Sequence, residues 1–281
     1  MESTELQLQE KHLPGCLALS KSANWNQNEA DWRLMLTLGR GWGVMLADGT
    51  LAASTLVLPY GGRFAWVSMV LVLPEQRRKG FATQLLRTAL QENSASRLTS
   101  ILDATPAGHE VYVQEGFQDR WGFKRFSASS FSREIALSEE IRSIEETDWP
   151  AILELDLHAF GASREPLLRN LASRLPEAAL VALRHGNLSG FLFGRDGREA
   201  CQLGPLVARD AQTANRLLDT GLALVRAPVY VDIADHAPAL QSLAQARGFE
   251  FQRRFTRMVT GAARAPGDEG LVYCPAGPEL G

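Results

Sequence analysis

The spacing of apolar and polar residues along the chain predicts helices that alternate with strands. In the first half, helical spacing occurs over residues 13–20, 29–38, 80–91 and 107–115, and strand patterns occur over 44–47, 51–58, 65–73, 97–102 and 117–131. In the second half, the same criteria predict helices over 148–160, 164–175, 211–225 and 237–246, and strands over 179–183, 188–193, 200–207, 229–233 and 249–258. The Gly- and Pro-rich tail, 261–281, adds one short edge strand near 271–274. Such alternation is typical of α/β or α+β domains.

The two halves also share sequence. The segment that begins at Gly116-Phe117 returns at Gly248-Phe249, an offset of 248 − 116 = 132 residues. The same offset relates two further pairs of segments, 82–86 with 214–218 and 103–107 with 235–239. Three matches in one order at one offset indicate a duplicated unit. We therefore predict two domains, residues 1–133 and 141–281, joined through the polar stretch 127–140.

Composition narrows the classes of function. The 281 residues suffice for about two domains. The 29 Lys and Arg residues against 32 Asp and Glu give a formal charge of −3, which disfavours a nucleic-acid partner. The apolar runs are too short to cross a membrane, and the polar start does not resemble a signal peptide. Three widely spaced cysteines (Cys16, Cys201 and Cys274) and the lack of a metal-ligand pattern predict a cytoplasmic protein without a metal site.

One loop carries candidate binding chemistry. An apolar strand ends at Pro74 and is followed, at the start of a helix, by Arg77-Arg78-Lys79-Gly80-Phe81-Ala82. A helix N-terminus presents unpaired backbone N–H groups and the positive end of the helix dipole. Gly80 lets a ligand approach the backbone closely, and the three adjacent cations attract an anion. The pattern predicts a pyrophosphate site, with a solvated basic turn as the alternative.

These residues resemble a known family. The strand, Pro74 and the spacing Arg77-x-x-Gly80-x-Ala82 resemble the acyl-CoA loop of the GNAT N-acetyltransferase superfamily. The stretch 102–117, in which Tyr112 precedes Gly116-Phe117 by four residues, is similar to that family's next element. The second half resembles the C-terminal half of a tandem subgroup through segments 160–164, 203–205 and 257–258. The resemblance implies tandem duplicated domains, each a mixed, mostly antiparallel sheet flanked by helices.

The resemblance also implies an activity and a set of residues. The chain is expected to move an acetyl group from acetyl-CoA, its co-substrate, directly to the amine of a small molecule. The backbone of Val70 and Val72 would pair with the pantetheine arm, and Tyr112 would protonate the leaving thiolate. The pyrophosphate would be held by the amides of Arg77, Arg78, Lys79, Gly80, Phe81 and Ala82. Alternatives are an acyl-CoA sensor without turnover and an acetyltransferase for a protein amine.

The general base is less sharply defined. An alkyl ammonium is almost fully protonated at neutral pH, so a group or a water chain must accept its proton. Asp103 is the first candidate, because it ends a strand next to the expected cleft. Asp31, Glu29 and His109 are weaker candidates. The alternative for Asp103 is a cap for the helix that begins near Pro106.

Four residues are candidates for the acceptor site. In the resembling family, a helix pair borders this site, so Trp25, Asn26 and Trp66 are expected to line it. Arg164 is a candidate partner for a substrate carboxylate at the domain interface. The alternatives are core packing for the tryptophans and a solvated position for Arg164 in a helix that Ser163 caps.

The second copy departs from the first at both functional positions. Its counterpart of the basic loop is three residues shorter, contains no glycine and carries Asp210. The counterpart of Tyr112 at the 132-residue offset is Ala244. We therefore predict that the second copy binds no acyl-CoA and serves packing, acceptor binding or dimerisation. A monomer and a homodimer both remain open, and no membrane partner is expected.

Overall fold

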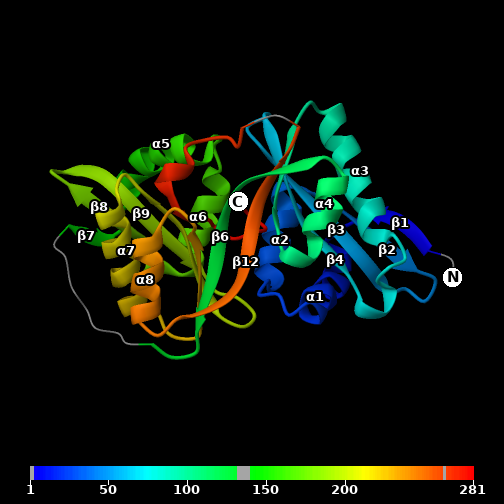
Figure 1. Ribbon diagram of the computed structural model, residues 1–281, viewed down its shortest axis with the longest axis horizontal. Helices are drawn as coiled ribbons and strands as arrows, with labels where there is room; N and C mark the ends of the chain where they lie inside the picture. The colour runs from blue at the N-terminus through cyan, green and yellow to red at the C-terminus, as the bar shows by residue number, and fades with distance from the viewer. Residues whose placement is uncertain (1–2, 132–139, 262–263) are drawn as a thin grey trace.

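The computed structural model describes residues 3–131, 140–261 and 264–281, and two α/β halves share one continuous sheet in it (Figure 1). The N-terminal half contains β1 (Ser3–Gln7), α1 (Leu13–Ser22), α2 (Glu29–Leu38), β2 (Arg40–Leu46), β3 (Leu51–Tyr60), β4 (Phe64–Val72), α3 (Phe81–Ala95), β5 (Thr99–Ala104), α4 (Pro106–Gln114) and β6 (Phe117–Ala128). The C-terminal half contains β7 (Ile141–Ser143), α5 (Trp149–Phe160), α6 (Glu165–Arg174), β8 (Leu180–Arg184), β9 (Asn187–Arg195), β10 (Cys201–Ala208), α7 (Ala211–Leu224), β11 (Val229–Ala234), α8 (Pro238–Ala246), β12 (Glu250–Thr260) and β13 (Val272–Cys274).

The hydrophobic pattern located the helices and most strands to within a few residues. The short strands β1 and β7 were not predicted, whereas the short strand expected near 271–274 is present as β13, which branches off the main order of the sheet and pairs with β10. The predicted join, 127–140, includes residues 132–139, which lie outside the described part of the chain. The expected fold class, a duplicated α/β unit with a mixed, mostly antiparallel sheet, is confirmed.

Alternation along the strands places helices on both faces of the sheet. Leu56 and Leu58 of β3 pack in the same cluster as α1 and α2, whereas Val57 between them packs in the cluster of α3. In the C-terminal half, Phe191 and Phe193 of β9 share a cluster with α5 and α6, and Leu192 shares one with α7 and α8. This arrangement buries both faces of the central strands.

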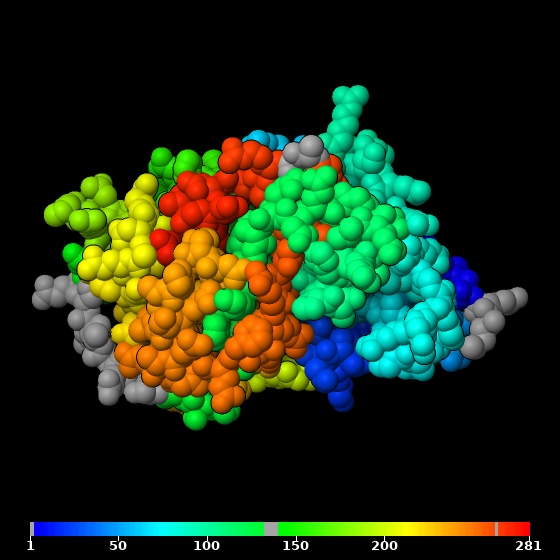
Figure 2. All heavy atoms as spheres, viewed as in Figure 1, coloured from blue at the N-terminus to red at the C-terminus, as the bar shows by residue number. Residues whose placement is uncertain are grey.

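The two halves exchange their last strands. The sheet order is β1-β2-β3-β4-β5-β12-β6-β11-β10-β9-β8-β7, so β12 lies beside β5 of the first half and β6 lies beside β11 of the second half. Figure 1 shows β6 and β12 side by side at the centre of the molecule, and in Figure 2 the orange atoms of α8 and β12 pack against the green atoms of α4 and β6. Neither half therefore completes its own sheet.

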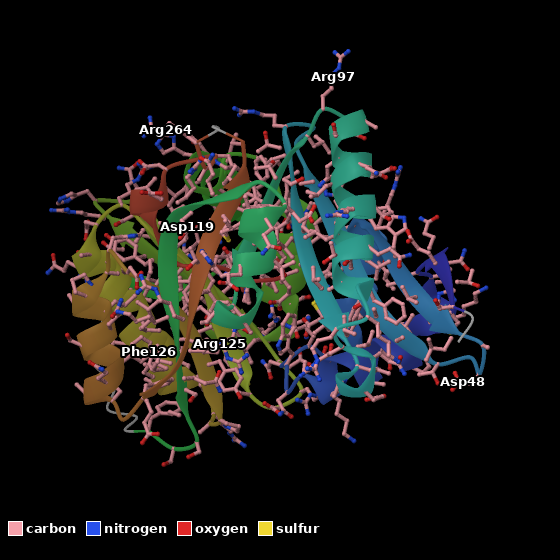
Figure 3. The ribbon with its side chains drawn as sticks, turned by 45° about the vertical axis from the view of Figure 1, so that its right-hand side comes forward. Asp48, Arg97, Asp119, Arg125, Phe126 and Arg264 are labelled. Carbon is pink, nitrogen blue, oxygen red and sulfur yellow. The ribbon has the colours of Figure 1, made fainter. Side chains whose placement is uncertain are left out.

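Apolar and ionic contacts also cross the junction. The ring of Phe160, at the end of α5, packs edge-on against Tyr60 of β3 at 4.8 Å between ring centroids. Arg125, labelled on β6 in Figure 3, forms a buried bidentate ion pair with Asp232 of β11, with both N–O distances 2.7 Å. Because each pair joins the two halves, the junction is part of the core rather than a flexible hinge.

Candidate active site

The main candidate site lies where two parallel strands diverge. β4 and β5 pair only from Phe64 with Thr99 to Trp66 with Ile101, and then separate. Met69 has a φ of 52°, and the register of β4 against β3 shifts beside it, so β4 bends away. The gap between the strands holds a cavity that is partly open to solvent, with about 480 Å³ of space free of protein atoms when the adjoining solvent is included. Ser68 and Val70 of β4 and Asp103 of β5 are among the residues that line it.

Beyond the point of divergence, β4 keeps one edge without a strand partner. Leu71 and Val72 pair with β3 on one side, whereas among the described strands none lies opposite the side that faces β5 after Trp66. Val70 lines the cavity, and Val72 lies further along the same strand. This edge of the strand therefore offers a linear ligand the hydrogen bonds that a further strand would make.

The loop after β4 forms a cradle of backbone amides. Gly80 is the residue before α3 and has a φ of 84°, and Arg78 has a φ of 61°. Within the described residues, no acceptor contacts the amides of residues 78–83, and the first amide of the helix that donates within the protein is that of Gln84, to the carbonyl of Gly80 at 2.9 Å. Alternating conformations with unpaired N–H groups make a concave site for an anion.

The cations of this loop are available to a ligand. Arg77, Arg78 and Lys79 are exposed. Arg77 donates only to the carbonyl of Val72, at 3.4 Å, and Lys79 donates to Gln76 at 2.7 Å. Among the described residues, none of the three forms an ion pair. The charge is therefore not neutralised by the protein and favours a bound phosphate.

Tyr112 of α4 lines the same cavity as Val70. Burial raises the pKa of its phenol to about 12, so the hydroxyl remains protonated through the physiological range. The ring lies against Gly108, one helical turn earlier. A Cβ atom at Gly108 would come within 2.9 Å of the Cε2 atom of Tyr112. Gly108 therefore lets the ring lie close to the helix axis.

We expect Gly108→Ala to lower activity without unfolding the protein. Alanine normally favours a helix over glycine by about 1 kcal/mol, but here the added methyl displaces the Tyr112 ring. Turnover should fall about 10-fold through loss of the hydroxyl's position, with the unfolding temperature unchanged or higher. In a Tyr112→Phe background the same change should have little further effect. Additive losses in the double variant would contradict this account.

Asp103 also lines the cavity, but both of its carboxylate oxygens are already hydrogen-bonded within the protein. Both of its carboxylate oxygens accept from Arg257 of β12, at 2.9 and 3.0 Å, and Arg257 lies between the rings of Trp66 and Trp121. Burial raises the pKa of Asp103, and Arg257 offsets part of that shift. Asp103 does not cap α4, which begins after Thr105 without a side-chain cap. A carboxylate held in this way is poorly placed to accept a proton from a substrate.

The weaker base candidates lie elsewhere. Asp31 is buried and forms ion pairs with Arg174 and Arg195 of the second half. Glu29 pairs with Arg33 on the exposed face of α2, and His109 contacts Asp119 at 2.8 Å. The side chains of Asp31, Glu29 and His109 therefore lie outside the cavity.

The structure separates the tryptophan and asparagine candidates. Trp25 lines the cavity. Asn26 does not, because its amide binds Glu199 and Ala200 of the second half. Trp66 is buried on another face, where its indole N–H donates to the carbonyl of Pro278 at 3.0 Å. The acceptor site that we propose therefore keeps Trp25 and leaves out Asn26 and Trp66.

Arg164 also has an internal role. Its side chain is buried, donates to both oxygens of Asp156 at 3.0 and 2.9 Å, and contacts the carbonyl of Gly281 at 2.7 Å. The residue precedes α6, and its guanidinium lies over the ring of Phe160. It is therefore neither solvated nor available for a substrate carboxylate, because its charge is already paired.

Several polar residues of the cavity were not predicted, among them Gln27, Ser68, Arg253 and Glu279. Three buried oxygen atoms among them have no hydrogen-bond partner within the described part of the chain, namely Oε1 of Gln27, Oγ of Ser68 and Oε2 of Glu279. Ser68 left a signal in the sequence, since it is a hydroxyl inside a buried apolar strand. Gln27 is adjacent to Asn26, and Arg253 lies in the repeated segment that begins at Gly248, where the first copy has Trp121. Glu279 lies in a tail that carries no distinctive motif.

The corresponding region of the second half is filled by the protein itself. β10 and β11 are parallel and also separate after a few residues, as β4 and β5 do. Here β13 occupies the gap and pairs with Leu206 and Val207 of β10. The first turn of α7 is capped by Asp210, whose carboxylate accepts from the amide of Thr213 at 2.7 Å. Both features support the prediction that this half binds no acyl-CoA.

The described residues hold neither a metal-binding cluster nor a membrane-spanning helix. Within residues 3–131, 140–261 and 264–281, no group of three or more His, Cys, Asp or Glu residues is arranged to hold a metal ion. Over the same ranges, no helix combines the length and apolar character required to cross a bilayer.

Comparisons with known proteins match both halves. A family model described as "Acetyltransferase (GNAT) family" matches residues 10–117, and one described as "Acetyltransferase (GNAT) domain" matches residues 152–274. The chain is 27% identical over 249 residues to the uncharacterized N-acetyltransferase YitH of Bacillus subtilis, a match that covers 87% of this chain and 86% of that protein.

Solved structures share the fold over nearly the whole chain. A putative acetyltransferase from Pyrococcus horikoshii superposes with a TM-score of 0.82 at 18% identity, covering 99% of this chain and 96% of that one. A tandem GNAT protein from the clavulanic acid biosynthesis pathway superposes with a TM-score of 0.64 at 17% identity, covering 95% and 100%. At these identities the likeness shows the fold alone.

Proposed function

The chain belongs to the GNAT acetyltransferase family as a tandem member and is an acyltransferase, and from this premise we propose that its N-terminal half transfers an acetyl group from acetyl-CoA to the amine of a small molecule. One observation carries the proposal. The unpaired edge of β4 leads from the cavity that Tyr112 lines to the unpaired amides of residues 78–83. Together these features offer a linear site with an anion cradle at one end and a polar cavity at the other.

Each part of the acyl donor has residues suited to it. The amides of residues 78–83 and the cations Arg77, Arg78 and Lys79 would hold the pyrophosphate. The backbone of Val70 and Val72 would pair with the amide groups of the pantetheine arm. This arrangement would bring the thioester into the cavity beside Tyr112.

The reaction joins an amine and a thioester directly. The amine nitrogen forms a bond to the acyl carbon, the carbon–sulfur bond breaks, and the products are an amide and a free thiol. Tyr112 would donate its phenolic proton to the departing thiolate. Because a thiol has a pKa of about 8.5, the thiolate leaves readily and needs only modest help from an acid.

The amine must also lose a proton. Among the described residues that line the cavity, Asp103 and Glu279 carry carboxylates. Asp103 has both oxygens bonded to Arg257, whereas Oε2 of Glu279 has no partner. We therefore propose Glu279 as the acceptor of the ammonium proton and assign Asp103 to positioning Arg257.

The enclosure of the cavity favours a small acceptor. The C-terminal tail contributes Pro278 and Glu279 to its wall, and Trp25 and Gln27 come from the α1–α2 connection. The tail is fixed by hydrogen bonds from Tyr60 to the carbonyl of Leu280, at 2.8 Å, and from Trp66 to that of Pro278. A lysine on a folded protein requires an open groove, and a metabolite fits a closed pocket.

Calorimetry with acetyl-CoA and a thiol-release assay with an amine panel test the proposal. We expect one binding site per chain and release of free CoA with at least one small amine. Binding of acetyl-CoA without release for any amine would favour a sensor. Release only with peptides or proteins would favour a protein amine as acceptor. Absence of binding would overturn the proposal.

Replacing Tyr112 tests the role of the acid. We expect Tyr112→Phe to lower kcat by about 100-fold, at the low end of general acid catalysis, because the thiolate is a good leaving group. The dissociation constant for acetyl-CoA should remain unchanged, since the phenyl ring keeps its packing against Phe117. Steady-state kinetics and calorimetry on the same preparation would check both values. Turnover equal to that of the native protein would remove Tyr112 from the mechanism.

A further inference from the structure

We propose that the acceptor is a small zwitterion that carries a carboxylate as well as the reacting amine, with Arg253 binding the carboxylate and Glu279 receiving the ammonium group. This inference rests on the proposed function and specifies its substrate class. It depends on charges and unpaired polar atoms of the cavity, and both charged groups, Arg253 and Glu279, come from the second half of the chain.

In the part of the chain that the structure describes, the charged side chains around the cavity form ion pairs, except for one arginine. Asp103 is paired with Arg257, Arg125 with Asp232, and Glu279 with Arg195. Arg253 of β12 also lines the cavity, and among the described residues no carboxylate lies within ion-pair distance of it. Burial and the neighbouring Arg125 lower the pKa of Arg253, and Tyr230, Asp232 and Glu199 offset only part of that shift.

A guanidinium in this position selects for an anion. Its planar array of N–H donors matches the two oxygens of a carboxylate. The acyl donor supplies no charge here, because its thioester end is neutral and its phosphates are assigned to the loop at residues 78–83. The acceptor itself is therefore the source of the missing negative charge.

The unpaired oxygen atoms of the cavity define the other end of the acceptor. Oε1 of Gln27, Oγ of Ser68 and Oε2 of Glu279 are all buried without a partner. Glu279 is 2% exposed, and its other oxygen binds Arg195. An ammonium group has three N–H donors and no acceptor, so it complements a cluster of unsatisfied oxygen atoms. Leaving these atoms unpaired is costly, which favours a ligand with donors.

The position of Glu279 is fixed from both halves. Arg195 of β9 donates to the carbonyl of Ala276 at 3.0 Å as well as to Glu279. Trp66 of β4 holds the carbonyl of Pro278. The tail therefore presents its carboxylate to the cavity of the first half while β13, just before it, fills the cleft of the second half. This gives the second half a role in acceptor binding.

The test compares matched acceptors with matched variants. The probes are the common amino acids, their carboxamides and the corresponding amines without a carboxylate, each with acetyl-CoA in a thiol-release assay. For the native protein we expect kcat/KM for the preferred amino acid to exceed that of its carboxamide and its decarboxylated amine by about 10- to 100-fold, as for a charge-assisted hydrogen bond.

Arg253→Gln should abolish that preference. It should raise KM for the amino acid by about 10- to 100-fold and leave the carboxylate-free amines unchanged, and Arg253→Lys should restore part of the difference. Arg254→Gln is the control, because Arg254 lies on the same strand but pairs with Asp235 outside the cavity. Glu279→Gln should weaken every amine alike, because all of them share the ammonium group.

Three results would overturn the inference while the proposed function stands. They are equal use of carboxylate-free amines by the native protein, an equal loss for all acceptors in Arg253→Gln, and binding of acetyl-CoA without turnover of any amino acid in the panel. If native protein bound no acetyl-CoA in calorimetry, the proposed function itself would fail. Thermal unfolding and the acetyl-CoA dissociation constant of each variant separate a folding defect from a loss of acceptor binding.

Discussion

Gly80→Asp is expected to abolish binding of acetyl-CoA at ordinary concentrations, with a loss in affinity of roughly 1000-fold, or about 4 kcal/mol. The substitution places a carboxylate at the residue before α3, beside the unpaired amides of residues 78–83. The carboxylate would compete for these donors and repel a diphosphate. Charge-assisted hydrogen bonds of about 1.5–3 kcal/mol each account for such a loss when two are removed.

The second half of the chain supports this expectation. Asp210 stands at the residue before α7 and already accepts from the amide of Thr213, so this helix N-terminus is occupied by the protein's own anion. Gly80→Asp would give α3 the same negative charge. The chain thus contains both arrangements, one with glycine and free amides and one with aspartate and a satisfied cap.

Gly80→Asn is the matched control. Asn and Asp have nearly the same shape, and both tolerate the left-handed φ of 84° better than other residues with a side chain. A Cβ atom at this position meets no atom within 4 Å, so neither change creates a clash. We expect Gly80→Asn to lower the affinity for acetyl-CoA by about 10-fold. Both variants share the backbone strain and the bulk of the side chain, but only Gly80→Asp adds a negative charge. Calorimetry with acetyl-CoA would measure both. Equal affinities for the two variants would contradict an anion cradle at Gly80.

The sequence predicted the elements well because their periodicity is local. Helix 29–38 and the start of the helix at Gly80 follow from a few neighbouring residues, and the structure places them at Glu29–Leu38 and Phe81–Ala95. The anion loop was likewise readable, since its glycine, cations and strand–helix context are contiguous.

The cavity was less predictable because its residues come from distant segments. In Trp25-Asn26-Gln27, the pattern indicated a polar stretch but not which side chains turn to the cavity and which to the second half. Glu279 lies in a tail with no periodicity, and only the packing of that tail against Trp66 and Arg195 brings its carboxylate to the site. These contacts are tertiary and leave no local pattern.

The strand exchange was also hidden from the sequence, for a different reason. β6 begins at the Phe of one Gly-Phe pair and β12 directly after the other, and both strands carry aromatic and arginine residues at corresponding positions, as Phe123 and Phe255 illustrate. Each strand is therefore chemically suited to close either half. The rings of Phe123 and Phe255 stack against each other across the two strands, with their centroids 5.0 Å apart. A repeat predicts that two similar strands exist, but not which half each one completes.

The exchange leads to the second large expected effect, which is that residues 1–131 will not fold alone. In that fragment β6 loses both neighbours, β12 and β11, and β5 loses β12. Breaking these ladders leaves backbone groups unpaired and exposes the ring of Phe123, which is fully buried in the whole chain. The buried Arg125 would also lose Asp232, at a cost of about 3–5 kcal/mol. Such losses are comparable to the entire stability of a small domain.

Co-expression of residues 1–131 with residues 140–281 should restore the protein. Because β6 and β12 then regain their ladders, we expect a one-to-one complex in analytical ultracentrifugation that binds acetyl-CoA like the intact chain. Each fragment expressed alone should be insoluble or lack a cooperative unfolding transition. A monomeric N-terminal fragment with cooperative unfolding and bound acetyl-CoA would show that β6 closes its own half in solution. The complex, in contrast, would establish that acyl-donor binding in one half depends on a strand contributed by the other.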